Sequence, residues 1–258
     1  MTTRYICVIG GKGGVGKTTS AISLAHAMGK HRKTLLVDAN LSTPNAHIHL
    51  GSPLLKKSLM NALKGEISVE EAIYSHDSGL RIIPTISTVK DLKLLKYDKL
   101  KQTIRELEGE AEIIILDTAA GLNRESITAI EACDEALVIT NPELSAVLDS
   151  QKAIQVANEL GKTILGVVLN KRGEHRHELN VPEIEKLLDL PVIGIIPYDR
   201  KIKSAQQFRH PVTYIHPNSK SSKSYEELAG LLLGKTYFES TGRDRTLYNY
   251  VLRKLGLD

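Results

Sequence analysis

The sequence predicts an α/β fold, a doubly wound and mostly parallel sheet with helices on both faces. Short aliphatic runs without polar alternation, such as residues 34–37 and 113–116, are typical of strands that are covered on both faces. Stretches with helical spacing of apolar residues separate these runs, and strands that alternate with helices favour a parallel sheet. The ligands of such a sheet bind at the carboxyl ends of its strands.

Length and composition place the chain among globular proteins. Its 258 residues suffice for one large domain with a buried sheet. Residues 1–4 lead straight into an apolar run and leave no room for a signal peptide, so we expect a cytoplasmic protein. A formal net charge of +4 permits weak attraction to anionic lipid or nucleic acid and argues for neither.

A glycine-rich segment, residues 10–19, follows the apolar run 5–9 and opens a helical pattern. Glycines let successive backbone N–H groups turn inward, and the helix N-terminus adds a partial positive charge. The pattern predicts the phosphate loop of a P-loop NTPase, with Lys17 against the β- and γ-phosphates and the Thr18 hydroxyl on magnesium. The loop residues expected to bind the nucleotide are Gly11, Lys12, Gly13, Gly14, Val15, Gly16, Lys17, Thr18 and Thr19.

A second lysine early in this loop, Lys12, is more than phosphate binding requires. With it the segment resembles the signature of the MinD/ParA family of deviant Walker A ATPases, Lys-Gly-Gly-x-Gly-Lys-[Ser/Thr], and archaeal-type MinD homologues in particular. The resemblance extends from residue 4 to about 234. It implies that ATP and Mg²⁺ are the cofactors, that two copies form a homodimer around them, and that Lys12 reaches the phosphates of the partner subunit.

The helix predicted from Ser20 to Met28 leads into strand 34–37, which ends at Asp38. A carboxylate there can hold magnesium through water or orient an attacking water. Residues 38–51 resemble the first switch region of the family, in which many members carry a second aspartate where this chain has Asn40. An amide can aim a water but takes no proton, so the resemblance implies a slow ATPase. His47 and His49 lack a third ligand at suitable spacing, which makes a metal site there the weaker interpretation.

Residues 52–112 are less informative. We expect short helices around Gly65, a strand over 80–84 and a helix in the lysine-rich stretch 90–105. Interleaved acids make that stretch a solvated face rather than a nucleic-acid surface, so nucleic acid is the less favoured partner.

The aliphatic run 113–116 ends in Asp117, which predicts a Walker B aspartate that supports magnesium through its water shell. Residues 118–122 resemble the second switch of the family. There the backbone of Gly121 can approach the γ-phosphate because no side chain blocks it.

The C-terminal third continues the alternation. A strand at 135–140 precedes a helix that runs to about Gly161, near which partner proteins dock in the family. Strand 163–169 ends at Asn170, whose amide can pair with adenine, and strand 191–196 ends at Pro197 and Asp199. The resemblance puts this loop in the adenine pocket, although Asp199 can equally cap the helix that starts at Arg200.

We divide the chain into an ATPase domain, residues 1–234, and a linker with an amphipathic helix, residues 235–258. Five apolar side chains fall on one face of that helix, namely Leu247, Tyr248, Val251, Leu252 and Leu255. The tail resembles the basic helix with which bacterial MinD enters the membrane surface, which would bring the protein to the inner face of the cell membrane. Packing of the helix on the protein body or on a partner is an equal alternative.

The function predicted from these features is a slow ATPase switch that dimerises on Mg-ATP and serves spatial positioning, with an unidentified protein as activator. Two alternatives stay open. One is a metal-centre maturation factor or nitrogenase-reductase-like ATPase, against which Cys7 and Cys133 argue because they show no Cys-x-x-Cys spacing. The other is a nucleotide-gated scaffold with negligible hydrolysis, to which Asn40 gives support.

Overall fold

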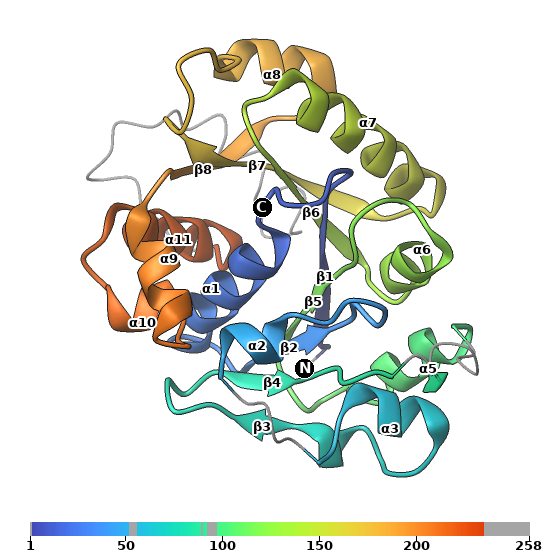
Figure 1. Cartoon of the computed structure of the whole chain (residues 1–258). Coiled ribbons are helices and arrows are strands. Elements are labelled where there is room, and N and C mark those ends of the chain that lie inside the picture. The colour runs from blue at the N-terminus through green and yellow to red at the C-terminus, as the bar shows by residue number, and fades with distance from the viewer. Residues whose placement is uncertain (1, 52–55, 89, 92–96, 235–258) are drawn as a thin grey trace.

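The structure, a computed structural model, describes residues 2–51, 56–88, 90–91 and 97–234. Within them one sheet has the strand order β3-β4-β2-β5-β1-β6-β7-β8 (Figure 1). All neighbouring strands pair in parallel except β3, which runs antiparallel to β4. The strands are β1 Arg4–Ile9, β2 Thr34–Asp38, β3 Tyr74–Ser75, β4 Arg81–Ile83, β5 Ile113–Asp117, β6 Glu135–Thr140, β7 Thr163–Arg172 and β8 Val192–Pro197. The predicted fold class is confirmed.

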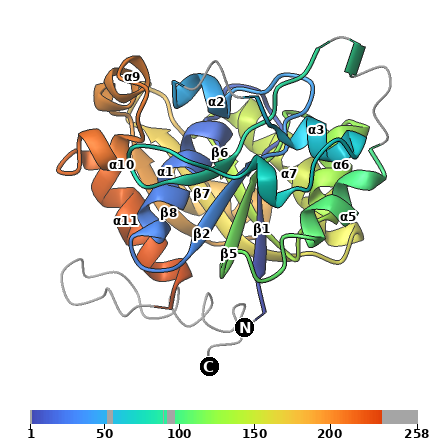
Figure 2. The same ribbon diagram turned by 90° about the horizontal axis from the view of Figure 1, so that it is seen from below.

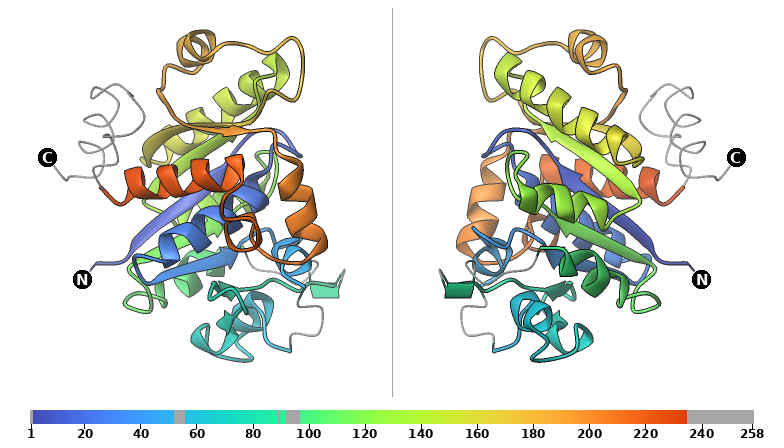
Figure 3. Two further views of the ribbon diagram at one scale, coloured as in Figure 1. Left: turned by 90° about the vertical axis from the view of Figure 1, so that its left-hand side faces the viewer. Right: turned by 90° about the vertical axis from the view of Figure 1, so that its right-hand side faces the viewer.

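Helices cover both faces of the sheet (Figures 1 and 3). In the left view of Figure 3, α1 and α11 lie across one face, and in the right view α6 and α7 lie across the other. The helices described are α1 Lys17–Gly29, α2 Ala46–His49, α3 Leu59–Lys64, the 3₁₀ helix η1 Glu70–Ala72, α5 Lys99–Arg105, α6 Arg124–Glu131, α7 Leu144–Glu159, α8 Val181–Leu188, α9 Arg200–Gln207, α10 Val212–Ile215 and α11 Lys220–Leu232.

Strand β5 shows why the central strands lack polar alternation. All five of its residues are buried. Ile114 and Leu116 belong to the apolar cluster under α5–α8, whereas Ile113 and Ile115 belong to the cluster under α1 and α11. Because each face meets its own helical layer, both sets of side chains are apolar.

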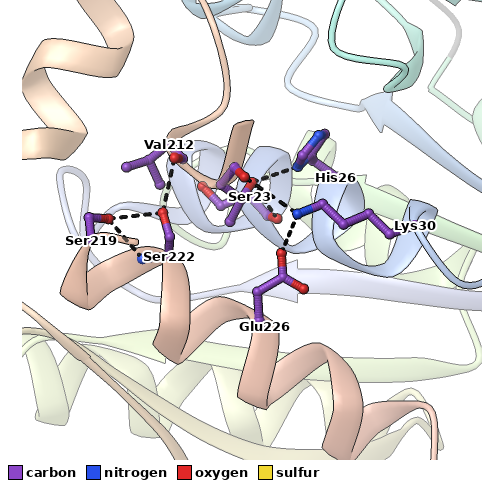
Figure 4. A network of polar contacts seen from close by, with 8 residues as sticks. Ser23, His26, Lys30, Val212, Ser219, Ser222 and Glu226 are labelled. Carbon is purple, nitrogen blue, oxygen red and sulfur yellow. Dashed lines mark hydrogen bonds and ion pairs between the residues drawn. The ribbon is translucent and has the colours of Figure 1, made fainter. Parts of the chain in front are cut away.

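A polar network fastens α11 and α10 to α1 (Figure 4). His26 Nδ1 lies 2.8 Å from the Thr213 hydroxyl, and Lys30 donates to Glu226 over 2.6 Å. The helices that follow the last strand are thereby fixed against the helix that follows the phosphate loop.

Parallel pairing brings the carboxyl ends of the strands to one edge. Asp38 at the end of β2 is the register partner of Asp117 at the end of β5. Figure 2 shows α2 and α9 at this edge, opposite the edge at which β1 starts.

Two sequence-based expectations need adjustment. Strand β7 continues through Asn170 to Arg172, so Asn170 lies within the strand rather than after it. The short antiparallel strand β3 was not expected.

The five apolar residues of the predicted amphipathic helix, from Leu247 to Leu255, lie outside the described residues. In the part of the chain that is described, no helix is long and apolar enough to cross a bilayer.

Candidate functional site

The glycine-rich loop connects β1 to α1, and two of its glycines have left-handed backbone angles. Gly14 has φ +80° and Gly16 has φ +96°, conformations that L side chains rarely adopt. A Cβ at Gly16 would meet Asn170 Nδ2, and one at Gly11 would meet the backbone of Asp149 on α7. Glycine is therefore required both by conformation and by close packing.

A cavity of about 520 Å³ opens beside this loop at the carboxyl edge of the sheet. Ten of the predicted nucleotide, metal or catalytic residues line it, namely Gly13, Gly14, Gly16, Lys17, Thr18, Thr19, Asn40, Asn170, Pro197 and Asp199. The other six predicted residues do not line it, namely Gly11, Lys12, Val15, Asp38, Asp117 and Gly121.

Lys17 is the first residue of α1 and is buried, with 7% of its surface exposed. Its Nζ lies 3.5 Å from the Lys12 carbonyl oxygen. Burial lowers the pKa of Lys17, and the charge on Asp117 opposes this shift. An ammonium group that is buried in a loop of inward-facing amides is suited to a polyphosphate.

The paired carboxyl groups of Asp38 and Asp117 lie fully buried behind the loop. The pKa of Asp117 is raised to about 6 by burial, against the effects of Thr18 and Lys17. Burial and the charge on Asp117 raise the pKa of Asp38 well above its ordinary range. Backbone N–H groups of Asn40 and Ala46 donate to Asp38, over 3.2 and 3.1 Å.

Asp117 differs from Asp38 in that both of its buried carboxyl oxygens lack a hydrogen-bond partner among the described residues. Buried polar atoms without partners are rare, and a carboxylate with a nearby hydroxyl is a donor set that Mg²⁺ prefers. Thr18 and Asp117 therefore suit a hydrated magnesium ion, whereas both oxygens of Asp38, the third predicted metal residue, already accept backbone N–H groups.

The amide of Asn40 is engaged within its own loop. Its Nδ2 donates to the Thr43 carbonyl over 2.7 Å, and its Oδ1 accepts from the Thr43 N–H and hydroxyl over 3.3 and 3.0 Å. Asn40 lines the cavity, but in this conformation its polar atoms close a turn.

Lys12 extends away from the cavity, toward the start of α7. Its Nζ lies 3.2 Å from the Ser145 hydroxyl and 3.5 Å from Glu143 Oε2. The side chain is 44% exposed. The two loop lysines thus face different directions, Lys17 inward and Lys12 toward the surface.

Beside the phosphate loop, Asn170 Nδ2 donates to the Val15 carbonyl over 2.7 Å, which gives Val15 a structural place in the loop. Asp199 accepts from Lys201 N at 2.9 Å and caps α9. It also accepts from the N–H and hydroxyl of Ser221. These bonds support the capping role of Asp199, whose side chain holds two helices together.

Gly121 lies in the turn after β5 with φ +80°, and no atom is near the position of a Cβ. Its backbone is therefore open to approach, although it does not line the cavity.

Several cavity residues were not found from the sequence. Among them are His49, Lys171, Ile202, Lys203 and Gln206. Gln206 Nε2 donates to the Thr19 hydroxyl over 3.2 Å and so joins α9 to the phosphate loop helix. The two residues are 187 positions apart, and no local pattern marks such a contact. For His49 the sequence predicts an ordinary surface or core residue, whereas the structure places it in the cavity wall.

Cys7 and Cys133 are both fully buried, and Cys7 Sγ donates to the Glu135 carbonyl over 3.3 Å. They serve as small core side chains in this fold.

Comparisons with known proteins agree with the site. Residues 6–212 match the model of the CobQ/CobB/MinD/ParA nucleotide binding domain. An ATP-binding protein of Methanocaldococcus jannaschii is 32% identical over 90% of this chain and 88% of its own length.

Solved structures extend the likeness. The septum site-determining protein MinD of Pyrococcus horikoshii, complexed with Mg-ADP, is 31% identical, with a TM-score of 0.84 over 88% of this chain and 94% of its own. The MinD chain of a MinC:MinD cell division complex from Aquifex aeolicus is 25% identical, with a TM-score of 0.83 over 93% of this chain and 99% of its own. An adenine nucleotide with magnesium is thus a ligand of a close structural relative, as the sequence predicted. The chain belongs to the CobQ/CobB/MinD/ParA family of nucleotide-binding proteins.

Proposed function

We propose that this protein is a MinD/ParA-type ATPase that forms a homodimer on binding Mg-ATP and resets by slow hydrolysis. The observation that carries the proposal is the direction of Lys12. Lys17 alone supplies the buried cation of the phosphate loop. The side chain of Lys12 points out of the loop toward the start of α7, beside Glu143 and Ser145. A cation there can serve a second subunit that covers the cavity.

The residues divide the chemistry among them. Lys17 and the loop N–H groups bind the phosphates, and Thr18 with Asp117 and Asp38 holds hydrated Mg²⁺, which neutralises phosphate charge. Asp38 orients the attacking water, since phosphoryl transfer depends mainly on positioning and electrostatics. Asn170 offers its buried Oδ1 to the adenine amine.

We expect slow turnover because of Asn40. Its side chain is an amide that takes no proton, so it cannot act as a second carboxylate beside the attacking water. Its polar atoms are also hydrogen-bonded to Thr43. The same observation favours a second candidate, a scaffold that is gated by nucleotide and hydrolyses almost none. The ATPase is favoured because Asp38 and Asp117 are both in place.

We propose that the switch serves spatial positioning, because relatives named for septum-site determination share this fold. We propose that a protein partner activates hydrolysis. That the Aquifex relative was solved in complex with MinC supports the existence of such a partner. The ATPase core would be residues 1–234, and the 235–258 segment would attach it to the inner face of the membrane.

The dependence of the ATPase rate on protein concentration tests whether the active enzyme is a dimer. Phosphate release per subunit should rise with protein concentration and then level off, because only the dimer is competent. Lys17→Ala should abolish release, and Lys57→Ala, which removes an exposed partner of Glu71, should leave it unchanged. Release that is strictly proportional to protein at all concentrations would contradict a dimeric enzyme, and no release would favour the scaffold.

Membrane attachment has its own test. Full-length protein and a 1–240 chain are sedimented with anionic liposomes in ATP. The proposal expects ATP-dependent pelleting of the full chain alone, because one short amphipathic helix binds weakly and a dimer presents two. Equal pelleting of both chains would remove the membrane role.

A further inference from the structure

A buried carboxylate joins the two segments that follow β2 and β5. Glu125 Oε2 accepts from the Ser42 hydroxyl over 2.6 Å, and Oε1 accepts from the Ser42 N–H over 3.0 Å. Glu125 is 3% exposed and Ser42 is half-buried. The residues are 83 positions apart, so the contact is made by the fold and not by local sequence.

This carboxylate has no ion-pair partner among the described residues, although its neighbour Arg124 pairs with Asp98 over 2.9 Å. A buried carboxylate without a cation is costly unless hydrogen bonds satisfy it. Glu125 lies in the first turn of α6, where the helix N-terminus favours negative charge, and Ser42 supplies two donors. If Ser42 withdraws, the carboxylate loses both donors.

Both segments that the contact joins contain residues that line the nucleotide cavity. Asn40 and Thr43, on either side of Ser42, line the cavity, as do Thr118 and Ala120 in the segment before α6. The loop of Ser42 begins at Asp38, and the segment that leads to Glu125 begins at Asp117. The contact therefore adds a side-chain link between the two segments that carry the predicted metal carboxylates. Their first residues already meet through the backbone, where Ala39 N–H donates to the Asp117 carbonyl over 2.9 Å.

We propose that Glu125 is a positioning residue that holds Ser42 and so makes segments 38–51 and 117–125 respond to the nucleotide as one unit. The inference rests on the proposed function and deepens it. Glu125 does not reach the cavity and takes no part in the chemistry; it fixes the loop from which Asp38 and Asn40 act.

A double-mutant cycle tests the tie. Ser42→Ala removes the hydroxyl donor, and Glu125→Gln keeps the shape but not the charge. We expect each to lower kcat about tenfold with KM changed less than about threefold, because positioning is lost and nucleotide contacts remain. The double variant should be no slower than Glu125→Gln alone, since both act on one contact. Additive losses would overturn the proposal.

Two further variants separate positioning from folding. Ser42→Thr keeps both donors and should retain kcat within about threefold of the wild type. Glu131→Gln makes the same charge change at the other end of α6 and should leave kcat unchanged. Two outcomes would contradict a specific role of the Ser42–Glu125 contact. One is a loss of kcat in Glu131→Gln equal to that in Glu125→Gln, and the other is a Ser42→Thr enzyme as slow as Ser42→Ala.

Amide hydrogen exchange gives a readout that does not depend on turnover. In nucleotide-free protein, Ser42→Ala should raise amide exchange in 117–125 as well as in its own segment, 38–51. Glu125→Gln should raise exchange in 38–51 as well as in its own segment, 117–125. Increased exchange confined to the mutated segment would overturn the tie. If the wild type neither hydrolyses ATP nor dimerises, the proposed function fails while this experiment still decides whether the two segments are joined.

Discussion

Asn170 on β7 donates its Nδ2 proton to the carbonyl oxygen of Val15, 2.7 Å away, and so joins the phosphate loop to β7. The same side chain keeps a buried Oδ1 without a partner among the described residues. One amide therefore fixes the loop through its donor and offers its acceptor to a base. This arrangement works only because Gly16 leaves room for the amide.

Gly16→Ala should lower nucleotide affinity at least about tenfold. The new Cβ would collide with Asn170 Nδ2, and φ +96° is unfavourable for alanine. Gly29→Ala is the matched control, because Gly29 ends α1 with no atom near its Cβ position. Fluorescent-nucleotide titration measures both, and equal affinities in the two variants would refute the steric role of Gly16.

Asn40→Asp should destabilise the free protein by about 1–3 kcal/mol, the scale for a buried polar group that loses its partner. The carboxylate would replace a donor that now faces the Thr43 carbonyl at 2.7 Å. Urea unfolding measures the change, with Asn218→Asp, at an exposed position before α11, as the control. Unchanged stability would show that the turn does not depend on the amide. A steady-state ATPase rate equal to that of the wild type would count against a role of Asn40 in turnover.

Asp117→Asn should change the pH dependence of stability in the absence of nucleotide and magnesium. The pKa of Asp117 is about 6 in the folded protein and 3.8 as the ordinary value, so the native state holds its proton longer than the unfolded state. The free energy of unfolding of the wild type therefore falls as pH rises from about 4 to above 6. Relative to Asp117→Asn, we expect a loss of about 2–3 kcal/mol across this range.

Comparison of the two proteins is needed because buried histidine acts in the opposite sense. Burial lowers the pKa of His26 to about 4, so its neutral form stabilises the fold at neutral pH and this contribution is lost as pH falls through that value. Both proteins contain His26, so the difference between their urea unfolding curves at pH 4.5 and 7.5 removes the histidine contribution and reports Asp117 together with its effect on Asp38. Identical pH dependence would contradict the raised pKa.

The sheet and most of its elements could be predicted from the sequence because their signals are local. In two short segments the signal for the backbone stands beside the functional residue. The aliphatic run 113–116 is followed directly by Asp117, and the glycine-rich loop contains Lys17. Parallel register then brings Asp38 beside Asp117 without further information. Strand β3 escaped prediction because two residues, Tyr74 and Ser75, carry no periodicity.

The part of the site that was missed depends on contacts between distant segments. Gln206 meets Thr19, and Glu125 meets Ser42, through packing that no spacing in the sequence marks. The position of Asn40 after a strand predicts a role in orienting water, whereas its bonds to Thr43 depend on how the loop turns. The sequence allows Asp199 either to cap a helix or to line the adenine pocket, and its bonds to α9 and α11 favour the cap.

The measurement that tests the central claim most directly is the mass of the protein in solution with Mg²⁺ and a non-hydrolysable ATP analogue. Sedimentation velocity should show the 28.4 kDa chain pass to twice its mass with the analogue and not with ADP. Lys12→Ala should bind the analogue and remain a monomer. A wild type that stays at 28.4 kDa at every concentration, or a Lys12→Ala protein that dimerises equally well, would contradict the account.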